Sequence, residues 1–338
     1  MSPEAGIVGA VNPRQRTVGV VVAIALLAAG ATVGVTLAQS DKATTPIAGA
    51  GAVSKPLKGD PPLVLELGVR DDAEAKALRE GSKLLDAGKR LEAAQVFLRW
   101  HSLDAQVAQI IAQWSTDAGL RGLQALALEH PDSGLAQLHL GLGLIWVGRI
   151  GDAEKAWRLA LTKDPDSAYA VRATDLLHSN LPRGLPVFVP SFPQPTGLDG
   201  LTPARQLALL QRRANAGAPH DRITYGIALE RLSHRVSAER QMALAAASAP
   251  DDPEALAAAA FARFDKEAPS RAFSQLGPLS KRFPKSATVR YHLGILLLWL
   301  GDVPNSRKQL LQAVKLGKQT DAVVASATAV LAELAKIK

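Results

Sequence analysis

The segment LHLGLGLIWVG at positions 138–148 recurs as YHLGILLLWLG at positions 291–301. The two copies share a His, the Leu-Gly pair after it, a Trp and a final Gly: His139/His292, Leu140/Leu293, Gly141/Gly294, Trp146/Trp299 and Gly148/Gly301. Upstream, a Pro and a Ser also match, as Pro131/Pro284 and Ser133/Ser286. One structural unit therefore occurs at least twice, and the rest of the chain can be interpreted outward from it.

A period of 34 residues surrounds these segments. It links small residues and prolines, at Gly226, Ala260 and Gly294, at Pro131 and Pro165, and at Pro250 and Pro284. A small residue in the middle of a helix lets a second helix approach closely, and a proline ends the helix before it. Each period therefore predicts one helical hairpin. The block 134–167 is the most complete, with Ala153, Trp157 and Pro165 following Gly141.

This pattern resembles the tetratricopeptide repeat (TPR), which has a Leu-Gly pair in its first helix, a small residue and an aromatic in its second, and a terminal proline. The resemblance implies an all-α fold, a right-handed α-solenoid of TPR-like helical hairpins, because a lone hairpin cannot bury its apolar face. The predicted units are 74–99, 100–133, 134–167, 219–252, 253–286 and 287–320. Residues 168–218 are predicted as a degenerate unit with helices at 168–178 and 203–215, and 321–336 as a capping helix.

The N-terminal part of the chain contains TVGVVVAIALLAAGATVGVTLA at 17–38, without a charge. At a rise of about 1.5 Å per residue, this segment would span roughly 33 Å, enough for the hydrocarbon core of a bilayer. We predict an N-terminal tail at 1–16, a single transmembrane helix at 17–38, a flexible linker at 39–70 and the repeat domain at 71–338. The alternative is a signal peptide that is cleaved after Ala38.

Orientation follows from the residues that flank this segment. Arg14 and Arg16 immediately precede it, which favours an N-terminus inside the cell. We therefore expect a single-pass protein of the cell membrane, with the repeat domain outside the cytoplasm.

Nothing in the sequence indicates catalysis. Among 338 residues there is no cysteine, which excludes a thiol nucleophile and thiolate metal sites. Glycine-rich phosphate loops and metalloprotease or hydrolase motifs are also missing, so we predict no enzyme activity, no cofactor and no metal. His139 and His292 occupy equivalent repeat positions, and we expect them to be partly exposed duplicates without a ligand role.

The net charge of +8 comes from scattered Lys and Arg residues. It indicates a solvated surface, or alternatively attraction to an anionic membrane or polymer. Aromatic residues make up 4% of the chain, too few for base stacking, and no recognition motif is present. We therefore expect no nucleic-acid partner.

In the TPR family the first helices line a concave face. Carried onto this chain, the resemblance implies a partner-binding surface at Leu138, Leu142, Ile145, Trp146, Ile227, Arg231, Tyr291, Ile295 and Trp299. Such a largely apolar groove suits a peptide or amphipathic helix of a protein partner. The alternative is that a tight superhelix buries these residues against its own neighbours.

A Pro-rich insertion at about 180–202 contains VFVPSFPQP at 187–195. We favour an ordered strap across the groove, with Phe188 and Phe192 packed inside, over a mobile loop that offers a polyproline ligand.

The function predicted from these features is that of a membrane-tethered scaffold or chaperone-like adaptor for protein partners. Two alternatives stay open. One is an accessory factor of envelope protein maturation, such as cytochrome c biogenesis, and the other is a self-assembling structural protein that forms homo-oligomers.

Overall fold

The computed structural model describes residues 57–336, so the predicted tail and the segment at 17–38 lie outside the described residues. Fifteen helices, α2–α16, and no strand occur within this range. None of these helices is both long and apolar enough to cross a membrane. The all-helical prediction is therefore confirmed for this part of the chain.

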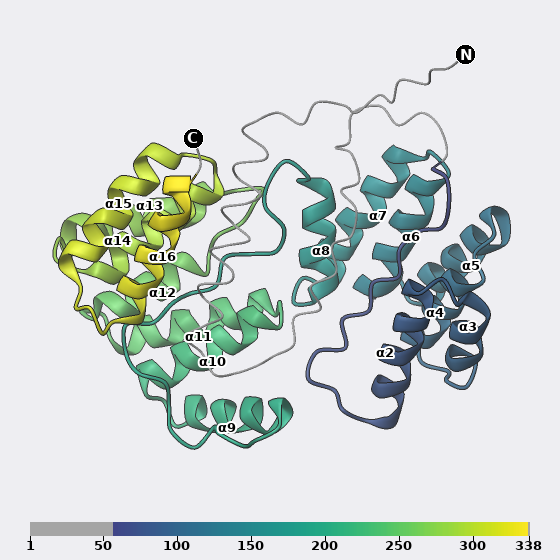
Figure 1. The fold of residues 1–338 in the computed structure, drawn as a ribbon, viewed down its shortest axis with the longest axis horizontal. Coiled ribbons are helices and arrows are strands. Elements are labelled where there is room, and N and C mark those ends of the chain that lie inside the picture. The colour runs from purple at the N-terminus through teal and green to yellow at the C-terminus, as the bar shows by residue number, and fades with distance from the viewer. Residues whose placement is uncertain (1–56, 337–338) are drawn as a thin grey trace, which may run out of the picture.

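Two lobes make up the molecule (Figure 1). Lobe 1 contains three hairpins and one further helix: α2 (Ala73–Asp86) with α3 (Arg90–Phe97), α4 (Leu103–Ala112) with α5 (Thr116–Glu129), α6 (Gly134–Trp146) with α7 (Ile150–Lys163), and α8 (Ala168–Leu177). Lobe 2 begins with one helix, continues with three hairpins and ends with another helix: α9 (Pro203–Asn215), α10 (Pro219–Arg231) with α11 (Arg235–Ser248), α12 (Pro253–Phe261) with α13 (Ser270–Arg282), α14 (Ala287–Trp299) with α15 (Val303–Leu316), and α16 (Ala322–Lys336). All six predicted hairpins are present.

Short-range signals in the sequence set the helix ends. Ser133 and Ser286 cap α6 and α14, since each side chain accepts a hydrogen bond from the backbone N–H three residues later. Gly148 and Gly301 follow these helices with φ of 80° and 79°, in the left-handed region that glycine adopts most easily. The same signals therefore close the equivalent hairpin in each lobe.

Within a hairpin, a small residue of the first helix faces a large residue of the second, sixteen positions later. A Cβ added at Gly141 would overlap the ring of Trp157, and one added at Gly294 would lie 3.0 Å from Leu310. The same relation joins Gly81 to Phe97 and Gly226 to Met242. In these four hairpins, one small-to-large pair thus sets the close approach of the two helices.

The degenerate unit predicted at 168–218 is wrong as a hairpin. Both of its helices exist, but α8 packs on α6 and α7, whereas α9 packs on α10. Each helix therefore covers the end of a different lobe, because the Pro-rich insertion between them separates the two. The predicted cap at the C-terminal end is confirmed: α16 packs on α14 and α15 and buries Val323, Ala327, Val330 and Leu334.

The junction between the lobes is polar. Asp166, before α8, accepts hydrogen bonds from the backbone N–H and the hydroxyl of Ser237 on α11, at 2.9 and 2.5 Å. Lys266 of lobe 2 donates to Asp175 of α8 and to the carbonyl of Pro182. These contacts connect lobe 2 to the last helix of lobe 1.

Two extended segments lie against the helices. We call residues 57–70 strap 1 and residues 182–195 strap 2; each leads into the helices of its own lobe (Figure 1). Strap 1 corrects the prediction of a flexible linker at 39–70, because Leu63, Val64 and Leu65 pack against the buried clusters of lobe 1. Strap 2 confirms the predicted ordered strap, with Phe188 and Val189 in the main cluster of lobe 2.

Candidate functional site: two cradles for extended chain

His139 on α6 binds strap 1. Its Nδ1 lies 2.9 Å from the carbonyl of Leu135, which can only accept a hydrogen bond, so Nδ1 carries the proton. The unprotonated Nε2 then accepts the backbone N–H of Val64 at 3.1 Å. Burial lowers the pKa of His139 to about 4, which keeps the ring neutral at pH 7 and preserves the acceptor.

His292 on α14 repeats this arrangement in lobe 2. Its Nδ1 lies 2.8 Å from the carbonyl of Thr288, and its Nε2 accepts the backbone N–H of Val189 at 3.0 Å. The ring of Phe188 stacks on the imidazole, with centroids 4.0 Å apart. Burial lowers the pKa of His292 to about 3, so this ring too is neutral. Both histidines are fully buried, and the expectation that they are partly exposed is wrong.

An acidic residue lies beside each histidine, on the first helix of the preceding hairpin. In lobe 2, Glu254 accepts the backbone N–H of Ser191 at 2.7 Å and the hydroxyls of Ser191 and Thr288. In lobe 1, Asp104 accepts the hydroxyl of Tyr169, and that hydroxyl accepts the backbone N–H of Glu66, each at 3.2 Å. Burial is the main cause that raises the pKa of both carboxyl groups.

We call these groups cradle 1 (Asp104, His139, Tyr169) and cradle 2 (Glu230, Glu254, His292). Each cradle receives backbone N–H groups from two alternating strap residues, 64 and 66 or 189 and 191. In cradle 2, Glu230 also accepts the N–H of Phe188 at 2.8 Å. Hydrogen bonds to every second residue are typical of an extended chain, because successive residues of such a chain face opposite sides. The cradles recognise main chain, which is independent of side-chain identity.

The nine residues predicted to bind a partner fall into two groups. Seven are buried within the chain: Leu138, Leu142, Ile145, Ile227, Tyr291, Ile295 and Trp299. Trp146 and Arg231 are half-buried. The lobe 1 residues share a cluster with Val64 of strap 1, and those of lobe 2 share one with Phe188 and Val189 of strap 2. Hence the faces that carry these residues are occupied by the protein's own straps, and partner binding there stays a prediction.

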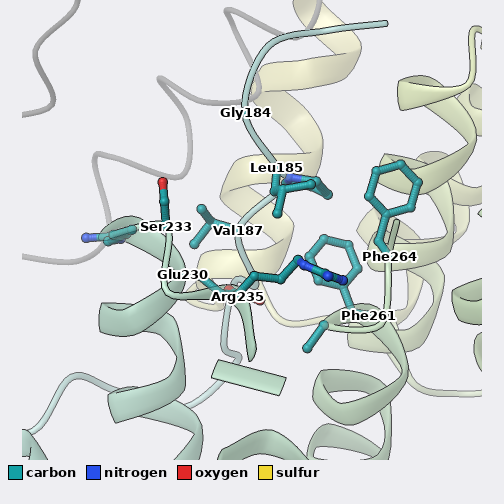
Figure 2. A pocket seen from close by; sticks show the side chains of 11 residues that line it. Gly184, Leu185, Val187, Glu230, Ser233, Arg235, Phe261 and Phe264 are labelled. Carbon is teal, nitrogen blue, oxygen red and sulfur yellow. The ribbon is translucent and has the colours of Figure 1, made fainter. Parts of the chain in front are cut away.

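A cavity of about 90 Å³ lies beside strap 2 (Figure 2). Leu185 and Val187 of the strap line it together with Phe261, the last residue of α12, and Phe264 just after that helix. Its polar lining comes from the turn between α10 and α11 and from the ends of these helices: Glu230, Arg231, Ser233 and Arg235. Apolar walls with a few polar groups are typical of sites that bind a ligand or a partner side chain.

The carboxyl group of Glu230, in this cavity, has a pKa far from its ordinary value. Burial raises the pKa of its carboxyl to about 8, against the opposing effects of the Phe188 N–H and the Arg231 charge. At pH 7 the protonated form therefore predominates. Ser233, at the same cavity, has φ of 62° and is the non-glycine residue with positive φ in the described range. It takes the turn position that Gly148 holds between α6 and α7 and that Gly301 holds between α14 and α15.

Sequence reasoning missed strap 1 and the role of the histidines. The equivalence of His139 and His292 was a visible signal, since a duplicated polar residue within an apolar helix needs a partner when it is buried. No local pattern identified that partner, because Val64 and Val189 lie 75 and 103 positions away from their histidines.

Searches with the sequence find no matching family model and no matching curated protein. Among solved structures, a tetratricopeptide repeat protein from Parabacteroides merdae is similar, with 11% identity, a TM-score of 0.30, and 76% of this chain and 98% of that chain covered. Yeast Tom70 is also similar, with 10% identity, a TM-score of 0.32, and 81% of this chain and 52% of that chain covered. Independently of these values, the six stacked hairpins and their small-to-large pairs give this chain a TPR-like arrangement.

Proposed function

We propose that this protein is a membrane-tethered scaffold that binds partner proteins through its TPR-like lobes. The observation that supports it is the pair of cradles. Each lobe holds an extended polypeptide on its first helices by main-chain hydrogen bonds, so the lobes are built to bind polypeptide. The uncharged segment at 17–38 supports the tether.

A partner-contact position in lobe 2 is the cavity beside strap 2. Its apolar walls suit an apolar side chain of a partner, and a single buried anchor of this kind carries much of the affinity of an interface. Arg235, which pairs with Asp265 at 3.5 Å, places a positive charge at the same cavity.

Photo-cross-linking in intact cells tests the scaffold. A photoreactive residue at Val187, which lines the cavity, should capture discrete proteins, while one at Leu128 on α5 serves as control, since that side chain is 81% exposed on a different lobe. Capture from position 187 that disappears in an Arg235→Ala background would support the proposal. Equal capture from both positions, or none from either, would contradict it.

The tether is tested by alkaline extraction of membranes. The native chain should stay in the membrane pellet, and a chain with Ile24→Arg and Leu27→Arg should be released, since each charge is costly at the centre of a span. Because the chain has no cysteine, Leu128→Cys gives a single label site. Labelling of intact cells by an impermeant maleimide would support a repeat domain outside the cytoplasm, and labelling only after lysis would place it inside.

A further inference from the structure

Strap 1 is held less firmly than strap 2. Phe188 and Val189 of strap 2 are 1% and 2% exposed, whereas the matching Leu63 and Val64 of strap 1 are half-buried. In cradle 2 the strap N–H groups reach the carboxyl groups of Glu230 and Glu254 at 2.8 and 2.7 Å. In cradle 1 the second N–H reaches only a tyrosine hydroxyl, at 3.2 Å. The longer N–H···O distance makes the hydrogen bond to the tyrosine hydroxyl the weakest of these three.

The connections of the two straps differ as well. Strap 2 joins α8 to α9, so both of its ends are fixed by the lobes. Strap 1 is followed by α2 through a turn at Gly68, where φ is 52°, and is preceded by 56 residues outside the described structure. Its other attachments lie at its two ends. At the first end the N–H of Leu57 donates to the carbonyl of Trp146 at 2.9 Å and Asp60 pairs with Arg90. At the second end Arg79 donates to the carbonyls of Gly68 and Arg70, and Arg70 pairs with Asp104.

The groove under strap 1 also contains a polar group that the strap does not satisfy. The indole Nε1 of Trp146 is buried and has no hydrogen-bond partner among the described residues. Trp146 packs in the same cluster as Val64, and its carbonyl already accepts the first strap amide. A buried N–H without an acceptor is unfavourable, so an occupant that supplied a carbonyl there would bind better than the strap does.

We propose that the groove of lobe 1, occupied by strap 1, is an exchangeable binding site for an extended segment of a partner protein. The strap defines the chemistry of that segment. It has N–H groups two residues apart for cradle 1, so proline is excluded at both positions, and aliphatic side chains like those of Leu63, Val64 and Leu65. An additional carbonyl of the segment accepts a hydrogen bond from the indole N–H of Trp146. This inference rests on the proposed scaffold function and names the partner class of one of its lobes.

Competition by the strap has a quantitative consequence. A tethered segment acts at an effective concentration in the millimolar range. The apparent affinity for a partner is therefore proportional to the fraction of molecules in which strap 1 has left the groove. Weakening the strap without changing cradle 1 must therefore increase the affinity for a partner segment.

Val64→Pro is the variant that does this, since it removes the N–H given to His139 and leaves the cradle intact. Val64→Ala is the matched control, because it shortens the side chain and keeps the N–H. The probe is a fluorescent synthetic peptide with the sequence of residues 57–70, and its affinity for the full-length chain in detergent is measured by anisotropy. We expect Val64→Pro to bind the probe about tenfold more tightly than Val64→Ala, and the native chain to bind it least.

Two modified arms test the geometry. A probe N-methylated at the residue equivalent to Val64 cannot donate to His139 and should bind about tenfold more weakly. In the native chain, amide hydrogen exchange at Val64 and Glu66 should be faster than at Val189 and Ser191. A folded Val64→Pro chain that binds no probe, an N-methylated probe that binds equally well, or equal protection of both straps would each overturn the proposal.

The oligomeric state of the Val64→Pro chain shows whether the segment in the groove comes from a partner protein or from a second copy. A monomeric Val64→Pro chain supports a partner protein, whereas dimers that form by exchange of strap 1 would overturn that assignment in favour of a second copy. The result of the probe experiment can also be distinguished from the result of the cross-linking experiment that tests the scaffold. Failure of the probe with successful cellular cross-linking at position 187 would reject the exchangeable groove alone, and the reverse result would reject the scaffold alone.

Discussion

Lys266 donates from Nζ to Oδ1 of Asp175 at 2.5 Å, and this ion pair joins lobe 2 to the last helix of lobe 1. The lysine side chain is 0% exposed and that of the aspartate 7%. Burial lowers the pKa of Lys266, while Asp175 acts in the opposite direction. Removal of one member leaves the other charge buried with incomplete compensation, which is the costly case for a buried pair.

We therefore expect Lys266→Met to lower the free energy of unfolding by about 3 kcal/mol. Urea denaturation of the full-length chain in detergent gives this value. Lys155→Met on α7 is the control, because its side chain is 79% exposed, and it should stay within about 0.5 kcal/mol of the native chain. Similar midpoints for the two variants would show that the pair does not hold the lobes together.

Gly141 and Trp157 provide a test of the hairpin packing. Gly141→Ala should destabilise the chain by about 1–3 kcal/mol, because the added methyl group overlaps a buried indole. Gly151→Ala on α7 has no neighbouring atom within 4 Å and should be neutral or stabilising. The double variant Gly141→Ala with Trp157→Leu should recover part of the loss, since Ala260 and Leu276 are buried at the equivalent positions of α12 and α13. Thermal unfolding that is unchanged by Gly141→Ala would reject this description.

Ser233 should gain from replacement by glycine. Its φ of 62° costs an L-residue about 1 kcal/mol, so Ser233→Gly is expected to raise the free energy of unfolding by up to about 1 kcal/mol. The reverse change at the matched turn, Gly148→Ser, should lower it by a similar amount. Chemical denaturation of both variants decides this. If Ser233→Gly instead destabilises, the hydroxyl must contribute more at the cavity than the backbone conformation costs.

Glu230 predicts a pH dependence. Its folded pKa of about 8 is above the ordinary value of 4.5, so the folded state binds more protons between these two values. The stability that this group contributes is complete below pH 4.5 and is lost as the pH rises toward 8.

Relative to Glu230→Gln, the native chain should thus become less stable as the pH rises from about 5 to 8. The two buried histidines have the opposite slope, between their folded pKa values of about 4 and 3 and the ordinary 6.5, but they are present in both chains and cancel. Glu92→Gln on α3, where the side chain is 57% exposed, is the control and should show no such trend. A pH-independent difference for Glu230→Gln would contradict the raised pKa.

The hairpins were predictable from sequence because their determinants are local. The Gly141–Trp157 pair, the caps at Ser133 and Ser286, and the turn glycines each involve residues no more than sixteen positions apart. Strap 1 was not predictable in this way. Its segment has no helical period, and its order comes from contacts with α6 and α8, which lie far along the chain.

The two tryptophans of the duplicated segment illustrate the same limit. Trp146 and Trp299 hold the same position in the duplicated segment, yet Trp299 is 1% exposed and lies near Lys266. Trp146 is half-buried, and its indole N–H has no hydrogen-bond partner among residues 57–336. The difference arises from what each lobe packs against at that point: the lobe junction in one case and the first residues of strap 1 in the other. Sequence similarity predicted the shared helix, and only tertiary contacts distinguish the environments.

Strap 2 has a consequence for biosynthesis. Val189 is made 103 residues before its acceptor His292, so at about 5–20 residues per second this apolar segment waits for roughly 5–20 s before α14 exists. During that interval an exposed apolar strand would be prone to pair with other chains. The prolines at 186, 190 and 193 remove backbone donors and disfavour such pairing. The residues that shape the strap in the finished fold thus also protect the nascent chain while its second lobe is still incomplete.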